Sequence, residues 1–131
     1  LMEGYLRRLE GRLRDAGALC PVFLMHSGGG IVNVDTAARF PVRLVESGPA
    51  GGAIFAAQVA RRLGLPRVLS FDMGGTTAKI CLIRDGAPKT ARVFEVARSY
   101  RFKKGSGMPI SIPVIDMVEI GAGGGSLAHV D

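Results

Sequence analysis

The sequence predicts an α/β fold in which a mixed β-sheet is flanked by helices. Three observations predict it: helical spacing of apolar residues near the start, an alanine-rich segment with helix-start and helix-stop residues, and short apolar runs divided by glycine-rich turns. Helical and strand-like segments are interleaved along only 131 residues, which is an ordinary length for one domain. We therefore expect residues 1–131 to form a single domain with one core.

The first expected helix covers residues 2–16. Its apolar side chains recur every three or four residues, at Met2, Leu6, Leu9, Leu13 and Ala16. Gly17 follows as a natural helix stop. We expect the stripe made by Met2, Leu6, Leu9 and Leu13 to be buried at least in part.

Three short strands are expected next, at residues 21–25, 31–34 and 41–45, because each is an apolar run with turn residues beside it. Residues 36–39 read as a short helical turn, for which Asp35 is the expected N-cap. A longer helix then runs to Leu63 and ends at Gly64. Ser47 or Gly48 is its expected cap, and Pro49 lies at or near its first position.

A β-hairpin is expected after this helix. Residues 67–71 read as a compact buried strand and residues 77–83 as its antiparallel neighbour, with the turn at 72–76. Asp85 and Gly86 then mark a second turn. Residues 90–102 and 110–120 continue as strand-like sequence, and the glycine-rich segment 121–126 ends the last strand.

The two cysteines are far apart, and each lies in an apolar run, so Cys20 and Cys81 are expected to be buried thiols of a cytoplasmic protein. They form no CxxC pair and no cluster with histidine, which argues against a zinc site. No stretch is long and apolar enough for a membrane-spanning helix, and no signal peptide is recognised. Asp116 and His129 form only a weak candidate metal pair, because two residues make no coordination sphere.

The net charge of +6 raises nucleic acid as a possible partner. The positive charge is concentrated in residues 84–104, with aromatic residues between the basic ones. The basic residues there are Arg84, Lys89, Arg92, Arg98, Arg101, Lys103 and Lys104. A solvated basic hairpin explains the same pattern, and we regard nucleic acid as the less favoured interpretation. Loss of binding with added salt would distinguish the two.

The sharpest motif is the segment Asp72-Met-Gly-Gly-Thr-Thr77, between the two strands of the expected hairpin. Two glycines let the backbone approach a ligand and direct several N–H groups into one concavity that suits phosphate oxygens. Thr76 and Thr77 add hydroxyl donors, and a carboxylate such as Asp72 can hold hydrated Mg²⁺. A plain hairpin turn is the alternative explanation.

This motif resembles the phosphate-binding hairpin of the actin-like and sugar-kinase-like ATPases. Four segments together resemble the hydantoinase A/5-oxoprolinase family in order and spacing. They are residues 25–31 (MHSGGGI), 41–52 (PVRLVESGPAGG), 70–77 (SFDMGGTT) and 120–126 (IGAGGGS). The resemblance covers nearly the whole chain. It implies an RNase H-like (actin-like ATPase) fold, incomplete here because the family's earlier D-x-G-G-T loop and later segments are missing. We expect an excised central domain.

The resemblance also implies a function. It implies an ATP-dependent hydrolase that opens a hydantoin or 5-oxoproline-type cyclic amide, using ATP and Mg²⁺, together with a hydantoinase B-type partner subunit or domain. Asp72 would anchor the metal and act in catalysis, while Gly74, Gly75, Thr76 and Thr77 would bind phosphate. The ATP-consuming subunit of an acetone or acetophenone carboxylase is the alternative from the same class. A non-catalytic nucleic-acid or interaction module, based on residues 84–104, is the alternative from another class.

Other residues keep two interpretations each. Lys79 can reach a phosphate, or it can face solvent from its strand. His26 can line the cleft with residues 27–30, although a lone histidine at a strand end is more often a structural hydrogen-bonding group. Residues 48–52 can meet an anion or pack closely on the sheet. Residues 121–126 can form a second phosphate-binding loop or a tight turn.

Overall fold

The computed structural model describes residues 1–97, 99–100, 105–127 and 129–130. The helices are α1 (Met2–Asp15), α2 (Val34–Arg39), the 3-10 helix η1 (Pro41–Leu44) and α3 (Ser47–Arg62). The strands are β1 (Phe23–Met25), β2 (Ile31–Asn33), β3 (Arg67–Met73), β4 (Ala78–Arg84), β5 (Ala87–Pro88), β6 (Thr90–Ala91), β7 (Phe94–Val96), β8 (Met108–Ile110), β9 (Val114–Ile115) and β10 (Met117–Ile120). Within the described ranges, none of the helices has the length and apolar character needed to cross a membrane.

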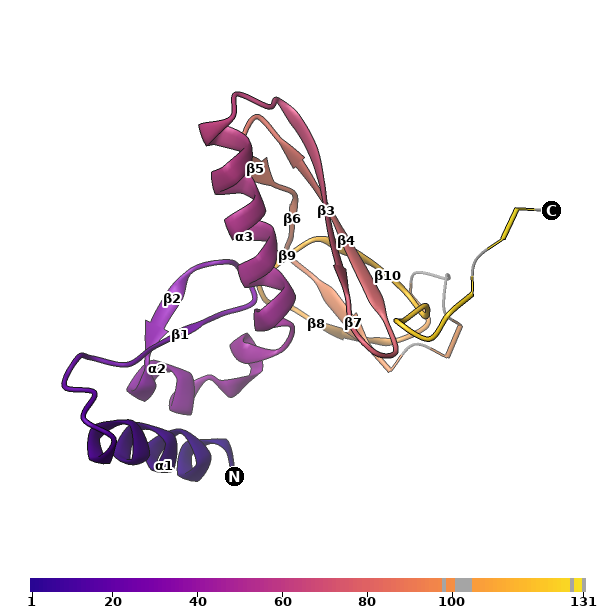
Figure 1. Ribbon diagram of the computed structural model, residues 1–131. Coiled ribbons are helices and arrows are strands. Elements are labelled where there is room, and N and C mark those ends of the chain that lie inside the picture. Colours follow the sequence, from indigo (N-terminus) through magenta and orange to yellow (C-terminus); the bar gives the residue numbers. More distant parts are fainter. Residues whose placement is uncertain (98, 101–104, 128, 131) are drawn as a thin grey trace.

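The main sheet has the strand order β10-β4-β3, with β5 paired to the far end of β4, and all its pairs are antiparallel (Figure 1). The expected hairpin is therefore confirmed. Its turn begins later than expected, because Asp72 and Met73 still pair with Lys79 and Ala78. The unpaired tip is reduced to residues 74–77.

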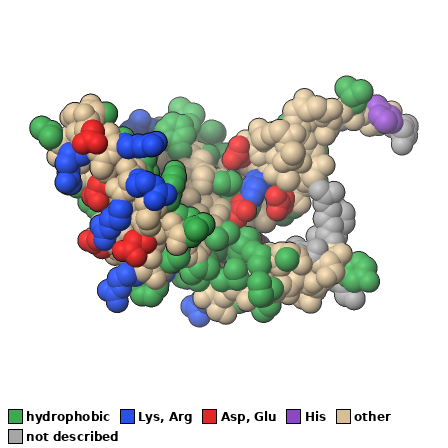
Figure 2. All heavy atoms as spheres, turned by 90° about the horizontal axis from the view of Figure 1, so that it is seen from below, with side chains coloured by type: hydrophobic (Ala, Val, Ile, Leu, Met, Phe, Trp, Pro, Cys, Tyr) green, Lys and Arg blue, Asp and Glu red, His purple; other side chains and the backbone are tan. Residues whose placement is uncertain are grey.

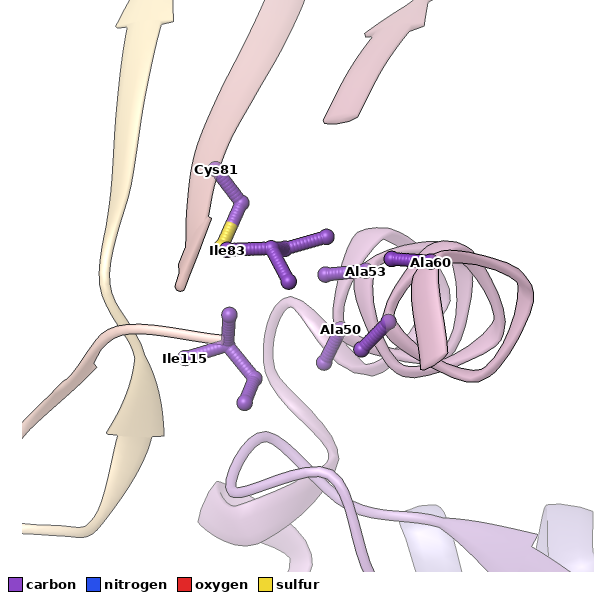
Figure 3. Close-up of a cluster of buried hydrophobic side chains, with 7 residues drawn as sticks. Ala50, Ala53, Ala60, Cys81, Ile83 and Ile115 are labelled. Atoms are coloured by element: carbon purple, nitrogen blue, oxygen red, sulfur yellow. The ribbon is translucent and has the colours of Figure 1, made fainter. Parts of the chain in front are cut away.

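Helix α3 covers one face of this sheet (Figure 1). The core between them contains four alanines of α3 and three larger side chains (Figure 3), namely Ala50, Ala53, Ala57, Ala60, Cys81, Ile83 and Ile115. Alanines every three or four residues form one helix face, and their small side chains let the helix axis approach the strands closely. Close packing thus accounts for the alanines of the helix, whereas a Cβ atom at Gly48 or Gly52 would meet nothing within 4 Å, so packing does not require glycine at those two positions.

The opposite face of the sheet is apolar and exposed. Alternate residues of the three strands point to it, and the exposed ones are Leu69, Phe71, Met73, Leu82 and Val118. The expectation that residues 67–71 form a buried strand is therefore wrong for one face. An apolar run does not say how many faces a strand has covered. In the view of Figure 2, hydrophobic side chains gather in the lower middle of the picture.

A second, smaller core lies around α1 and α2, so the expectation of one core is wrong. It contains Leu6, Val34 and Ala37, with side chains of β1 and β2 beside it. The expected first helix is confirmed, and its stripe is partly buried: Leu6 is 1% exposed, whereas Met2 is 39% and Leu13 is 37% exposed. The expected strands at 21–25 and 31–34 are also present as the antiparallel pair β1–β2.

Two expectations about the middle of the chain are wrong. Residues 41–44 form the 3-10 helix η1 instead of a strand, because Pro41 at its start removes an N–H donor and favours a turn. Helix α2 is capped by Asn33, whose side chain accepts a hydrogen bond from the N–H of Thr36 at 2.9 Å. Asp35, the expected cap, lies inside the helix.

The N-terminal cap of α3 and the environment of Cys20 also differ from expectation. Helix α3 begins at Ser47 itself, and its N-cap position is Glu46, whose side chain makes no capping hydrogen bond. Cys81 is buried as expected, but Cys20 is exposed. Cys20 lies outside both cores, in the connection after α1.

The basic segment 84–104 is only partly described. Its described residues include β5, β6 and β7, which pair with β4, β9 and β8. The nucleic-acid alternative depends on seven basic residues, and four of them lie outside the described residues: Arg98, Arg101, Lys103 and Lys104.

Candidate functional site

The hairpin tip between β3 and β4 is built from glycine and threonine. The N–H of Gly74 donates to the carbonyl of Thr77 at 2.9 Å. In the described part of the chain, the N–H groups of Gly75, Thr76 and Thr77 have no hydrogen-bond acceptor. Consecutive free N–H groups at a turn can bind an anion.

A hollow of about 200 Å³ lies between this tip and the start of α3. Its lining residues are Pro49, Asp72, Gly74, Thr77 and Lys79. Four of the six predicted site residues thus face one hollow, together with the glycine-rich helix start. Gly75 and Thr76, which are exposed, lie at the tip outside that lining.

Lys79 is held by two carboxylates. Its ammonium is ion-paired with Glu46 and lies 3.6 Å from a carboxylate oxygen of Glu119. The side chain is only 15% exposed, so the interpretation as a solvent-facing lysine is wrong. Asp72 and Glu119 are its partners in register on the two neighbouring strands. In Figure 2, acidic and basic side chains meet in a recess beside the C-terminal segment.

Glu46 has a left-handed backbone, with a φ of 61°. This conformation is unfavourable for a residue with a Cβ atom, and it persists only where the surroundings stabilise it. Here the ion pair with Lys79 is such a contact. Sequence reasoning did not find Glu46 or the pairing of Glu119 with Lys79, because neither the turn at 46 nor the register of β10 is visible in a local pattern.

The glycine loop 121–126 lies against the hairpin tip. The N–H of Gly124 donates to the carbonyl of Gly74 at 3.0 Å. Gly123 is buried, and a Cβ atom there would overlap the backbone of Gly75. Two segments almost fifty residues apart in the sequence are therefore joined at the site.

His26 has the structural role expected of a lone histidine. Its Nδ1 accepts a hydrogen bond from the N–H of Gly28 at 3.0 Å, and the block 26–30 does not line the hollow. Ser27 is buried and donates to the carbonyl of Pro113 at 3.2 Å, which joins the β1–β2 turn to the segment before β9. This block thus supports the core beneath α3.

The weak metal pair proposed for Asp116 and His129 gains no support. Asp116 is ion-paired with Lys89 at 2.6 Å. Throughout the described ranges, His, Cys, Asp and Glu side chains form no group of three that could hold a metal ion. Among the residues that line the hollow, Asp72 supplies the carboxylate.

Comparisons with known proteins give a consistent picture. The sequence signature of the family described as hydantoinase/oxoprolinase matches residues 1–131. An uncharacterized protein of Methanocaldococcus jannaschii is 40% identical over 134 residues, which is 100% of this chain and 20% of that protein. Caprolactamase subunit alpha of Pseudomonas jessenii is 31% identical over 131 residues, again 100% of this chain and 18% of that subunit.

The fold is also similar to a solved structure. The nucleotide-free structure of acetone carboxylase, from a study of ATP-dependent acetone carboxylation, matches with a TM-score of 0.74 and 25% identity. The match covers 96% of this chain and 16% of that chain. The chain thus spans about a fifth of the length of the relatives it matches.

Proposed function

The chain belongs to the hydantoinase/oxoprolinase family, and on this premise we propose that it forms one wall of the ATP-binding cleft of an ATP-dependent enzyme. The single observation that carries the proposal is the hollow beside the hairpin tip. There a carboxylate, a lysine and a threonine with a free backbone N–H line a space at the start of a helix, and two more free N–H groups lie beside it at the tip.

These residues fit a magnesium-bound nucleotide. The free N–H groups of residues 75–77 match phosphate oxygens, and the oxygen atoms of Asp72 match the hard ligands that Mg²⁺ prefers. When bound, ATP supplies a transferable phosphoryl group and Mg²⁺ neutralises charge on its phosphates. In this proposal Asp72 anchors the metal and serves in catalysis. Gly74, Gly75, Thr76, Thr77 and Lys79 orient the phosphates.

We further propose that residues 1–131 are one domain of a larger protein with an RNase H-like, actin-like ATPase fold. Three antiparallel strands in the order β10-β4-β3, with a helix across one face, fit such a sheet. The chain's share of its relatives' length also supports this proposal. One wall, open to water, holds a phosphoryl group from one side only, so this chain by itself should bind Mg·ATP weakly and turn it over negligibly.

The substrate class that we propose is a cyclic amide of the hydantoin or 5-oxoproline type. The relative named caprolactamase supports an amide ring as the substrate, and its designation as a subunit supports a partner of the hydantoinase B type. Amide resonance makes direct ring opening slow, so coupling to ATP provides a leaving group on the carbonyl carbon. In that reaction the residues of this chain hold phosphate and metal in place.

A ketone carboxylase is the second candidate, because the similar solved structure is that of an acetone carboxylase. In both candidates the hairpin binds the nucleotide and not the organic substrate, so it does not distinguish a cyclic amide from a ketone. Phosphate release by the full-length protein with its partner subunit would distinguish them. The amidohydrolase requires stimulation by a hydantoin or lactam, whereas the carboxylase requires acetone or acetophenone together with bicarbonate.

Asp72→Ala in the full-length protein tests the site. Asp72 is exposed, so the free energy of unfolding should change by less than about 0.5 kcal/mol. ATP turnover should fall by about a hundredfold or more, because the metal anchor is lost. The exposed Asp15, at the end of α1, provides the control Asp15→Ala, which should leave turnover unchanged. Normal turnover by the Asp72 variant would refute the assignment.

A further inference from the structure

One hydrogen bond is missing from the hairpin tip. Residues that face each other in a hydrogen-bonded pair of an antiparallel hairpin exchange two bonds, one in each direction. Gly74 and Thr77 exchange only one, from the Gly74 N–H to the Thr77 carbonyl. The return bond is absent, and the Gly74 carbonyl accepts the N–H of Gly124 instead.

The loop that supplies Gly124 is held by its own hydrogen bonds. The Gly123 N–H donates to the Ser126 hydroxyl oxygen at 3.0 Å, and the Ser126 N–H donates to the Gly123 carbonyl at 2.8 Å. Gly123 rests directly on the peptide unit between Gly75 and Thr76. Any side chain at 123 would have to displace the loop from the tip.

The same bonds argue against Gly123, Gly124 and Ser126 as phosphate-binding residues. The N–H groups of Gly123, Gly124 and Ser126 are all used, either within the loop or on Gly74. Donors that already have acceptors add little to the binding of an anion, because a bond must break for each one formed. The tip, by contrast, has free donors at residues 75–77.

We propose that Gly123, Gly124 and Ser126 form a positioning element that holds the hairpin tip in its anion-binding form. The Gly74 carbonyl is oriented to Gly124 and accepts no bond from Thr77, so the Thr77 N–H stays free, and Gly123 lies against the neighbouring peptide. Gly123 and Ser126 are thus positioning residues, and they touch no phosphate themselves. This inference rests on the proposed function for the ligand, but the geometry of the tip can be tested without it.

The test compares four variants of the full-length protein. Gly123→Ala displaces the loop, Ser126→Ala removes its internal acceptor, and Ser126→Thr restores that acceptor. Gly125→Ala is the matched control, because a Cβ atom there meets nothing within 4 Å. Thermal unfolding identifies any variant that fails to fold. If Gly123→Ala fails to fold, the comparison of Ser126→Ala with Ser126→Thr tests the proposal instead.

Two measurements are made on each variant: hydrogen–deuterium exchange of the peptide that contains residues 73–78, and Mg·ATP affinity by calorimetry. In Gly123→Ala the return bond from Thr77 to Gly74 should form, so one amide should exchange more slowly than in the parent protein. The dissociation constant should rise about tenfold or more, since charge-assisted hydrogen bonds are lost. Ser126→Ala should shift both readouts the same way, and Ser126→Thr and Gly125→Ala should match the parent.

The outcomes separate this inference from the proposed function. Unchanged exchange and affinity in both Gly123→Ala and Ser126→Ala would overturn the inference. If the parent protein binds no Mg·ATP, the proposed ligand is refuted. Slower amide exchange in Gly123→Ala would in that case still support the inference that the loop holds the hairpin tip in position.

Discussion

The ammonium group of Lys79 in β4 is ion-paired with the carboxylate of Glu46, the residue immediately before α3. The pair joins the sheet to the start of the helix that covers it. Both side chains are mostly buried, at 15% and 25% exposure. The hollow beside the hairpin tip therefore has one side fixed by an ion pair.

Lys79→Met should lower the free energy of unfolding by about 1–3 kcal/mol, because Glu46 is left without its partner in a partly buried place. The control is Lys89→Met, which breaks an exposed pair with Asp116 and should cost less than about 1 kcal/mol. Denaturant unfolding measures both. Equal effects would show that burial of the first pair is energetically unimportant.

Ile83 and Leu82 are neighbours on β4 that point to opposite faces of the sheet. Ile83 is 1% exposed against α3, whereas Leu82 is 47% exposed on the bare face. Ile83→Ala should cost about 2–5 kcal/mol by leaving a cavity, and Leu82→Ala should cost less than about 1 kcal/mol. Midpoints of denaturant unfolding give the comparison. A larger loss for Leu82→Ala would mean that the bare face is covered in the protein under test.

Asn33 is the residue that caps α2, through its bond to the Thr36 N–H. Asn33→Ala should destabilise the protein by about 1 kcal/mol, because that N–H loses its acceptor. Asp35→Ala removes an exposed ion pair with Arg7 and should cost less. Thermal unfolding of the two variants compares the capping hydrogen bond with the ion pair. A larger loss of stability in Asp35→Ala than in Asn33→Ala would contradict the assignment of Asn33 as the cap.

Cys20 and Cys81 should differ in reactivity. Cys20 is exposed and should react with iodoacetamide in the native protein, whereas Cys81 is buried and should react only on unfolding. Mass spectrometry of the labelled peptides measures this. Rapid native labelling of Cys81 would contradict its position in the core.

Burial also raises the pKa of the Cys81 thiol. The folded protein therefore holds this proton more tightly than the unfolded chain does. Stability should fall as the pH rises from the ordinary thiol pKa through the raised one, and it should be unaffected by Cys81 below that range. The difference in unfolding free energy between the parent and Cys81→Ala, measured across alkaline pH, isolates this contribution. A difference independent of pH would contradict the prediction.

The sequence by itself determined the elements whose signals are local. The stripe of Leu6 and its neighbours specified α1, and two apolar runs around Gly74 and Gly75 specified the β3–β4 hairpin. Each depends on residues within a few positions of one another, where spacing encodes the backbone conformation. The family was also visible at this level, because its motifs are continuous segments.

Tertiary structure alone decided which distant groups meet. Glu46 and Glu119 reach Lys79 from different elements, and Gly123 reaches Gly75 from the far end of β10. It also decided that the side of β3 bearing Phe71 stays bare and that residues 41–44 form a 3-10 helix. The spacing of apolar residues along an element indicates which of its faces each side chain lies on. What lies opposite depends on strand register and helix packing, which arise only when the whole chain has folded.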